Sequence, residues 1–349
     1  MDIILFMNLY VLTFLCAAAV AALSLPLLKH TLGRFLTDQP GGLKTHSRPA
    51  LLLGGCAVLA GTISALVLIR LITDFPTGTL HSLRGILGAG CLIFLLGLLD
   101  DLRKPKGLPI WLRLLVQAIA AGLLINYEVY VQIFQTTWLN YAFTFLWLVG
   151  LTNAFNLLDI ADGLCTSQTV ICTLGLFAIA LPGELWYVNF AALALLGSCL
   201  ACWPHNYKTP KIFLGDGGST FFGFFIAALA MGTQYSRHNP YGYAAALFIV
   251  AVPLLDTTFV ILARALQGKN PLKGSNDHLA LQLKNKYHFK NHTVILLFAL
   301  AAIGCNLLAY TLTKTTPAHT LALCVLAVLG AGMFILWLLQ KLNTFKHSS

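Results

Sequence analysis

Charged residues are scarce in this 349-residue chain. Only 10% of its residues are Asp, Glu, Lys or Arg, whereas 58% are hydrophobic. A soluble domain carries about 25% charged residues, so the composition excludes an ordinary soluble fold and indicates a membrane protein. The formal net charge of +10 would otherwise suggest a nucleic-acid partner, but cationic residues in membrane proteins mark cytoplasmic loops. We therefore expect no nucleic acid.

The nine cysteines lack the spacing of a metal site. Most lie inside apolar runs, and only Cys199 and Cys202 are close together in the sequence. That pair has no second Cys or His pair with which to complete a zinc site. We interpret all nine as small buried hydrophobic residues.

The chain also lacks internal repeats, low-complexity runs and any linker long enough to separate two domains. Its apolar runs approach the roughly 20 residues that cross a bilayer. They predict an all-α polytopic membrane protein in which residues 1–349 form one domain. Eleven transmembrane helices are expected, at about 3–24, 51–72, 84–99, 110–127, 138–157, 166–182, 186–203, 219–235, 241–263, 292–312 and 318–340.

The distribution of Lys and Arg predicts the orientation. With the N-terminus outside and the C-terminus in the cytoplasm, 18 of the 22 Lys and Arg residues fall on the inner side, as the positive-inside rule requires. Eight of the 12 acidic residues fall there too, most of them in short motifs near helix ends. The expected active-site loops are therefore cytoplasmic, at about 25–50, 100–110, 153–167, 204–219 and 264–291.

Two adjacent carboxylates, Asp100 and Asp101, end a predicted helix in GLLDDLRKPKGLP (97–109). The C-terminal end of a helix dipole is already negative and disfavours anions, so this pair requires a cation. Either a neighbouring Arg or Lys supplies it, as in a solvated loop with local ion pairs, or a bound metal does. Pro109 is suitably placed to open the next helix.

The stretch NAFNLLDIADGL (153–164) carries polar side chains at a spacing of three: Asn153, Asn156, Asp159 and Asp162. Steps of three residues rotate by about 60° on a helix, so a straight helix could not turn all four to one ligand. We expect the helix to unwind near Asp159 and Gly163 to end it. Such backbone is tolerated at membrane depth where it lines a watery cavity or is buried in protein. The alternative is that these groups join helices.

A glycine-rich turn precedes a predicted helix in IFLGDGGSTFFGF (212–224). Gly215 and Gly217 allow close backbone approach, and Ser219 is a suitable N-cap. Free N–H groups at a helix start suit a phosphate. Asp216 carries a negative charge at the place where a phosphate is expected to bind. A metal ion that bridges Asp216 to the phosphates would explain this arrangement.

The segment PLLDTTFVILAR (253–264) places Asp256 inside a predicted span, where an ionisable residue is costly and indicates function. Arg264, about two turns away, is the alternative explanation, as a snorkelling ion-pair partner. The following inner loop contains Asp277 and His278 in SNDHLALQL (275–283). A single loop histidine is ordinarily solvated.

Together, oxygen-bearing groups from four inner loops, surrounded by Lys and Arg, predict a Mg²⁺-dependent diphosphate site at the membrane face, with Mn²⁺ as a substitute. The apolar surroundings indicate that a second substrate is a lipid.

These motifs, in this order, resemble those of the polyprenyl-phosphate N-acetylhexosamine-1-phosphate transferases, which include the bacterial MraY and WecA enzymes. The resemblance covers KTHSRPALLLGG (44–55), GLLDDL (97–102), NAFNLLDIADGL, FLGDGGS (213–219) and PLLDTTFVILAR, and eleven spans fit the WecA branch. It implies transfer of a sugar 1-phosphate from a UDP-sugar, with UDP-N-acetylglucosamine as the first candidate, to undecaprenyl phosphate. UMP would be released, and the product would initiate a cell-surface polysaccharide at the bacterial inner membrane.

The resemblance also implies residue roles. Asp216 and Asn156 would be the Mg²⁺ ligands, and Asp100 would bind or deprotonate the lipid phosphate. The acids assigned to catalysis and to shaping the site are Asp100, Asp101, Asp159 and Asp162. The further candidates for substrate contacts are Lys44, Arg113, Asn153, Gly215, Gly217, Ser219, Asp256, Arg264 and His278. The expected partners are the lipid bilayer, the UDP-sugar and the polyprenyl phosphate, with the chain acting alone or as a homodimer.

The sequence departs from the family pattern at two places, of which the second concerns the sugar. Ile160 stands where the family has glycine, and only His278 remains of the HxHH loop of the WecA branch. Within the family, the alternative is a phospho-MurNAc-pentapeptide transferase, but the triple-histidine ending and threonine-rich glycine segment of MraY are missing. A rival from another class is a secondary transporter of anionic solutes, which predicts inverted repeats and midplane polar groups.

Overall fold

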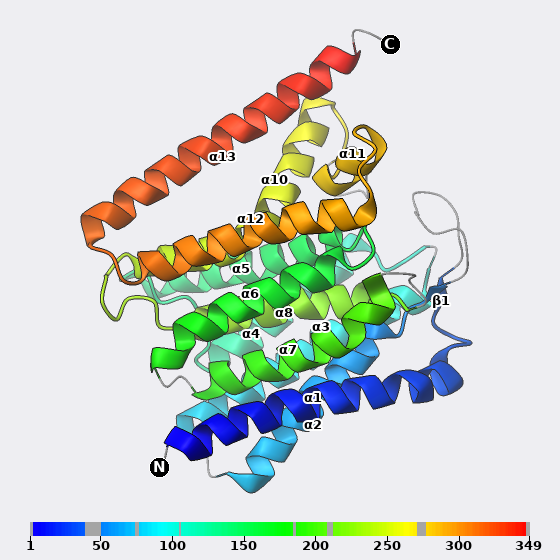
Figure 1. Ribbon diagram of the computed structural model, residues 1–349, viewed down its shortest axis with the longest axis vertical. Helices are drawn as coiled ribbons and strands as arrows, with labels where there is room; N and C mark the ends of the chain where they lie inside the picture. Colours follow the sequence, from blue (N-terminus) through cyan, green and yellow to red (C-terminus); the bar gives the residue numbers. More distant parts are fainter. Residues whose placement is uncertain are drawn as a thin grey trace.

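A computed structural model describes residues 3–38, 50–73, 77–104, 106–183, 186–207, 212–270 and 277–346. A helix, or in one case a bent pair, covers each of the eleven predicted segments (Figure 1). The helices are α1 (Ile3–Leu32), α2 (Gly54–Ile72), α3 (Thr77–Leu102), α4 (Ile110–Asn126), α5 (Thr137–Leu158), α6 (Leu164–Ala180), α7 (Trp186–Tyr207), α8 (Gly215–Gly232), α9 (Ala245–Ile249) with α10 (Ala251–Leu266), α12 (Asn291–Leu312) and α13 (Pro317–Lys346). A short helix, α11 (Leu279–Asn285), precedes α12. Lys44 lies outside the described residues, as do parts of the predicted loops 25–50, 204–219 and 264–291.

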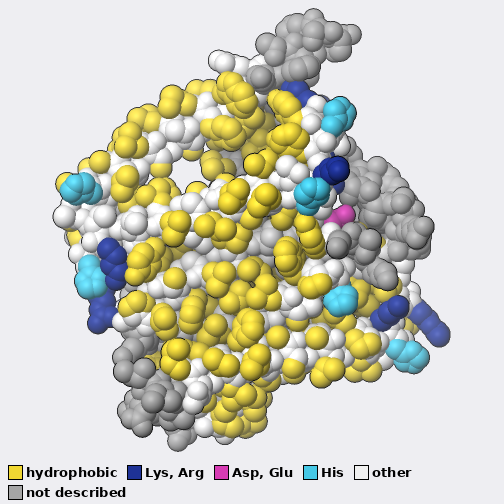
Figure 2. Space-filling view, viewed as in Figure 1, with side chains coloured by type: hydrophobic (Ala, Val, Ile, Leu, Met, Phe, Trp, Pro, Cys, Tyr) yellow, Lys and Arg dark blue, Asp and Glu magenta, His cyan; other side chains and the backbone are white. Residues whose placement is uncertain are grey.

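The chain is a helical, multi-pass membrane protein. Seven of the described helices are long and apolar enough to cross a membrane, and an eighth span results if α9 and α10 are taken together. The helices α4 and α6 are apolar but shorter, at 17 residues each. Figure 2 shows hydrophobic side chains over most of the visible face, with Lys and Arg gathered near its margins.

The most deeply buried helix is α8, whose first turn carries Asp216. It packs against α2, α3 and α5, and four of its phenylalanines are fully buried or nearly so: Phe221, Phe222, Phe224 and Phe225. In contrast, α13 diverges from the bundle (Figure 1): Leu323 and Cys324 near its start pack against the main core, and Leu338 and Leu339 near its end contact α10. Since α8 is held on several sides, the residues at its start are firmly positioned.

The ninth predicted span, 241–263, is wrong as a single helix. The chain breaks at Val250, and the axes of the flanking helices differ by 65°. The cause is Pro253, because proline has no N–H and its ring clashes with the carbonyl four residues earlier. That carbonyl, of Ile249, accepts a hydrogen bond from Cys172 Sγ at 3.1 Å instead.

A small β-structure departs from the all-α prediction. The strands β1 (Thr37–Asp38) and β2 (Ala50–Leu51) pair in antiparallel fashion, and Leu51 also forms a parallel bridge with Ile212. Phe213 N donates to Leu51 O at 2.7 Å, and Gly54 N donates to Phe213 O at 2.8 Å. These bonds fix the segment that leads into α8 against the start of α2.

Candidate active site

The site is assembled where α3 ends and α8 begins. Gly97 of α3 lies against the first turn of α8, where an added Cβ would come within 2.6 Å of Gly217 Cα. Only glycine permits this approach. It brings the Asp101 carboxylate, at the end of α3, next to the backbone of Asp216.

Asp101 is buried and ties the two helices together. Its Oδ1 accepts a hydrogen bond from Asp216 N at 3.0 Å, and its Oδ2 accepts one from Gly217 N at 3.1 Å. The carboxylate therefore occupies the positive end of the α8 dipole, which favours an anion. The prediction that these N–H groups are free for a phosphate is wrong, because Asp101 takes both.

Asp100 is buried and paired with a cation. Arg113 Nη2 lies 2.9 Å from Asp100 Oδ2 and 3.1 Å from Oδ1, and Leu108 N donates to Oδ1. Pro109 precedes α4, as predicted, and so places Arg113 on the first turn of that helix. Of the two sequence alternatives, a neighbouring Arg or Lys does supply a cation, but the pair is buried.

Lys104 joins two of the acids. Its Nζ lies 2.6 Å from Asp101 Oδ1 and 3.5 Å from Asp216 Oδ1. Asp216 is the more open of these carboxylates, with 26% of its side chain exposed against 2% for Asp101. It is also a hydrogen-bonding neighbour of the Asp100 carboxyl group. The three acids therefore meet at one place.

Asn156 reaches the same place from α5. Its Oδ1 accepts a hydrogen bond from Ser219 Oγ at 2.8 Å. Ser219 is not the N-cap that the sequence suggested, because α8 begins earlier, at Gly215. Its hydroxyl instead connects the Asn156 amide to α8.

The helix α5 ends at Leu158, so the predicted unwinding near Asp159 is confirmed. Burial, followed by the negative charge of Asp216, raises the pKa of Asp159 from 3.8 to about 7, although Lys104 opposes this shift. The carboxyl group of Asp162 is also within electrostatic range. Asp159 and Asp162 thus belong to the same electrostatic cluster as Asp216.

Gly163 does not end α5 but is the N-cap residue of α6, with a φ of +78°. Its N–H donates to Asn206 Oδ1 at 3.0 Å, and Asn206 Nδ2 donates to Ile212 O at 3.3 Å. Through these two hydrogen bonds, the buried Asn206 side chain joins the unwound stretch to the segment before α8. Nothing in the sequence around Asn206 marked it for this role.

Asn153 does not point into this cluster. Its Nδ2 donates to Gln117 Oε1 at 3.0 Å and to Val149 O at 2.7 Å. The amide therefore joins α5 to α4, which is the helix-joining alternative for this one member of the stretch.

A second polar cluster lies between α10 and α11. His278 Nδ1 lies 2.7 Å from Asp256 Oδ2, and Leu279 N donates to Asp256 Oδ1 at 2.9 Å. Both side chains of the pair are 1% exposed, so the expectation of a solvated loop histidine is wrong. Arg264 is not the partner of Asp256, because it binds Asp277 Oδ2 at 3.4 Å and Asn270 O at 2.9 Å.

Packing connects this second cluster to the first. Ala280 of α11 belongs to the same buried apolar cluster as Leu158 and Ala161 of the unwound stretch. Asn291 Nδ2 also donates to Asp162 O at 2.9 Å. Asp256 and His278 are therefore held at the border of the site.

The donor set suits Mg²⁺. In the described part of the chain no three His, Cys, Asp or Glu residues form a ready metal cage. Magnesium is usually bound by one or two protein oxygens together with substrate phosphates and water. The partly exposed Asp216 carboxylate and the Asn156 amide oxygen, on the packed helices α8 and α5, fit that requirement.

Lys104 was among the neighbouring cations expected to neutralise the Asp100–Asp101 pair, but the sequence prediction gave it no role in the site. The signal was present, because Lys104 follows Asp101 by three residues at a helix end, a spacing at which side chains meet. Its second contact, to Asp216, joins positions far apart in the sequence and could not be read from it.

Comparison with known proteins identifies the family to which this sequence is similar. The model of "Glycosyl transferase family 4" matches residues 83–234. The chain is 30% identical over 241 residues to a Bacillus subtilis (strain 168) protein named "Probable undecaprenyl-phosphate N-acetylglucosaminyl 1-phosphate transferase", covering 67% of this chain and 65% of that protein. It is 29% identical over 285 residues to a decaprenyl-phosphate N-acetylglucosaminephosphotransferase of Mycolicibacterium smegmatis, covering 72% and 70%.

A relative whose name gives a different sugar, N-acetylmuramoyl-pentapeptide, is matched over a larger share of its own length. A phospho-N-acetylmuramoyl-pentapeptide-transferase of Lactobacillus johnsonii is 30% identical over 281 residues, covering 73% of this chain and 84% of the relative. The matched family region, 83–234, contains the α3 carboxylates, the unwound stretch after α5 and the start of α8. The chain belongs to glycosyl transferase family 4.

Proposed function

We propose that this chain transfers a sugar 1-phosphate from a UDP-sugar to a polyprenyl phosphate and releases UMP. N-acetylglucosamine 1-phosphate is the first candidate for the transferred group, because the Bacillus and Mycolicibacterium relatives are named for N-acetylglucosamine. Undecaprenyl phosphate is the first candidate for the acceptor, and the product would initiate a cell-surface polysaccharide.

One observation carries this proposal. Carboxylates from α3 and α8 meet within a single ion-pair network, and the Asn156 amide from α5 is hydrogen-bonded to the same turn of α8. Phosphoryl transfer depends mainly on positioning and charge neutralisation. A site rich in acids and cations, at the end of an apolar bundle, suits a charged nucleotide together with a lipid.

Asp216 and Asn156 are the proposed Mg²⁺ ligands, and Mn²⁺ is a substitute. The ion would neutralise the diphosphate charge that develops during transfer. Arg113 is the proposed contact for the lipid phosphate, because its side chain remains 32% exposed while Asp100 fixes its orientation. Asp101 has a positioning role, since its oxygens hold the start of α8.

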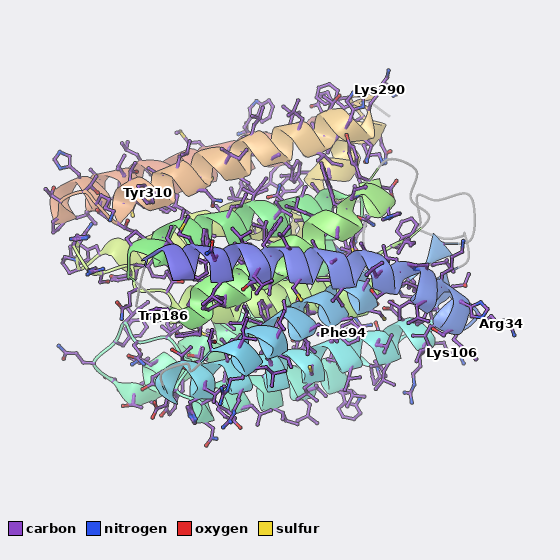
Figure 3. All side chains as sticks on the ribbon, turned by 60° about the horizontal axis from the view of Figure 1, so that its bottom comes forward. Arg34, Phe94, Lys106, Trp186, Lys290 and Tyr310 are labelled. Atoms are coloured by element: carbon purple, nitrogen blue, oxygen red, sulfur yellow. The ribbon has the colours of Figure 1, made fainter. Side chains whose placement is uncertain are left out.

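The proposed topology has eleven spans, with the N-terminus outside and the site facing the cytoplasm of a bacterial inner membrane. In Figure 3, the cationic residues Arg34, Lys106 and Lys290 lie toward one end of the bundle, and the aromatic residues Trp186 and Tyr310 lie toward the other. The positive-inside rule assigns the cationic end to the cytoplasm.

The deciding experiment is a panel of UDP-sugars. The purified chain in detergent, with Mg²⁺ and undecaprenyl phosphate, should release UMP with UDP-N-acetylglucosamine and not with UDP-MurNAc-pentapeptide. Release with the pentapeptide substrate alone would favour the peptidoglycan reaction. No UMP release with any member would reject the transferase proposal, and the absence of sealed vesicles separates this reaction from transport.

A further inference from the structure

Lys104 occupies the space between the two acids that join α3 to α8. Its ammonium is in short contact with Asp101, at 2.6 Å, and in looser contact with Asp216, at 3.5 Å. About a third of the side chain, 29%, is exposed, so the ammonium has a route out of the cluster. A lysine side chain is flexible and carries a compact charge, which makes it a suitable removable cation.

The other cation of the site is held differently. Arg113 Nη2 contacts both oxygens of Asp100, and Leu108 N binds the same carboxylate. Both oxygens of this carboxylate share one guanidinium nitrogen in a charge-assisted contact, and the carboxylate itself is held by the backbone. Of these two cations, Lys104 is therefore the one whose pairing can be exchanged.

The two charges compete for one carboxylate. A magnesium ion binds oxygen at about 2.0–2.1 Å, and an ammonium 3.5 Å from the same Asp216 oxygen would face a divalent cation at short range. Repulsion between the two favours movement of the flexible one. Asp101 would keep the hydrogen bonds from Asp216 N and Gly217 N after Lys104 leaves.

We infer that Lys104 is a tethered counter-ion, which neutralises Asp101 and Asp216 without metal and is displaced when Mg²⁺ binds, whereupon its ammonium contacts the nucleotide diphosphate. The inference rests on the proposed function in taking Asp216 as a metal ligand. It assigns Lys104 two opposite effects: it weakens the binding of the metal and strengthens the binding of the nucleotide.

The test measures metal binding without turnover. Wild-type protein and Lys104→Met are stripped with EDTA, and Mg²⁺ is then titrated by calorimetry and by thermal unfolding. Lys104→Met should bind Mg²⁺ about three- to tenfold more tightly, as expected when a partly buried ion pair no longer has to be broken. Lys106→Met is the matched control, because Lys106 is an exposed cation of the same loop; this variant should bind Mg²⁺ as the wild type does.

A second measurement uses UDP-N-acetylglucosamine at saturating Mg²⁺. Lys104→Met should bind the nucleotide sugar several-fold more weakly, although it binds the metal more tightly. A general loss of structure would weaken both. Unchanged or weaker Mg²⁺ binding in Lys104→Met would overturn the inference, as would unchanged nucleotide binding.

If Lys104→Met does not fold, Lys104→Arg provides the test. Its guanidinium can bridge both carboxylates, so this variant should bind Mg²⁺ more weakly than the wild type does, and equal or tighter binding would contradict the inference.

The results distinguish a failure of this inference from a failure of the proposed function. If Lys104→Met binds Mg²⁺ more tightly than the wild type but the wild type releases no UMP, the role of Lys104 stands and the transferase proposal is rejected. If the wild type turns over normally but the two proteins bind Mg²⁺ equally, the transferase proposal stands and the role of Lys104 is rejected.

Discussion

Neighbouring carboxylates of one site can have different tasks because their surroundings differ. Asp101 accepts hydrogen bonds from two backbone N–H groups and one ammonium, so both of its oxygens have donors. Asp216 has a more open side chain and a looser ion pair with Lys104. The first arrangement suits an acid that positions a helix, and the second suits an acid that exchanges one cation for another.

Asp216→Asn tests the metal assignment. The amide keeps the shape and much of the packing but removes the charge, so UMP release should fall at least about a hundredfold, in keeping with the several kcal/mol that a metal ion contributes to such reactions. Mg²⁺ should also no longer raise the unfolding temperature. Near-normal turnover in a folded variant would remove Asp216 from the metal site.

Asp159 provides a pH-dependent prediction. Its pKa is about 7 in the folded chain against the ordinary 3.8, so the folded state holds this proton more tightly than the unfolded state does. The carboxyl group therefore destabilises the fold as pH rises from about 4, and its full penalty is reached above about 7. In metal-free protein, Asp159→Asn should increase stability at pH 8 by about 1–2 kcal/mol, and the gain should be smaller at pH 5.

Thermal unfolding in EDTA at both pH values measures this effect. Addition of Mg²⁺ to the wild type should narrow its difference from the variant, because a nearby cation stabilises the ionised carboxylate. An equal gain at pH 5 and pH 8 would show that the charge of Asp159 is not the cause.

At the residue scale, the sequence predicted positions better than partners. Asp256 was recognisable because an ionisable residue inside an apolar run is costly. The partner of Asp256 could not be recognised from the sequence, because both Arg264 and His278 were compatible with the spacing. Only the path of the chain after α10 decides between them. Asn153 shows the same limit, because its spacing matches that of Asn156 although its amide faces α4.

At the scale of elements, apolar runs predicted which segments become helices but not how the helices meet. The end of α5 could be anticipated because polar groups at a spacing of three cannot share one face of a straight helix. The break at Val250 had a visible cause in Pro253, yet the surrounding run is apolar enough to pass for one span. The contact between α3 and α8 depends on glycines far apart in the sequence, so no local pattern reveals it.

Gly97→Ala tests that contact. The added Cβ would come within 2.6 Å of Gly217 Cα in α8, so the helices must separate, at a cost of about 1–3 kcal/mol. The shift moves Asp101 away from the N–H groups it binds, and we expect UMP release to fall much more than expression or detergent extraction does.

Gly88→Ala is the control for this substitution. It lies in the same helix, and an added Cβ there meets nothing within 4 Å. We expect wild-type activity from it, and equal losses in the two variants would mean that helix propensity, not the contact with α8, is responsible.

At the scale of the whole molecule, the charge pattern predicts which end faces the cytoplasm. Alkaline phosphatase fused after Arg237 should be active, since the enzyme matures outside the cytoplasm, and a fusion after Lys269 should be inactive. The physical reason is the resistance of cationic loops to translocation. The opposite pattern would reverse the proposed orientation, and activity at both positions would contradict the number of spans between them.

The engagement of the α8 amides by Asp101 has a consequence for how the chain would capture its soluble substrate. Many nucleotide-binding proteins hold phosphates with main-chain N–H groups at the start of a helix. These hydrogen bonds act only at short range. Here two of those hydrogens are already in use, so attraction of the nucleotide has to come from mobile cationic side chains. Such attraction is screened over about 8 Å at physiological ionic strength. Raising the salt concentration should therefore increase the KM for the UDP-sugar more steeply than it lowers kcat.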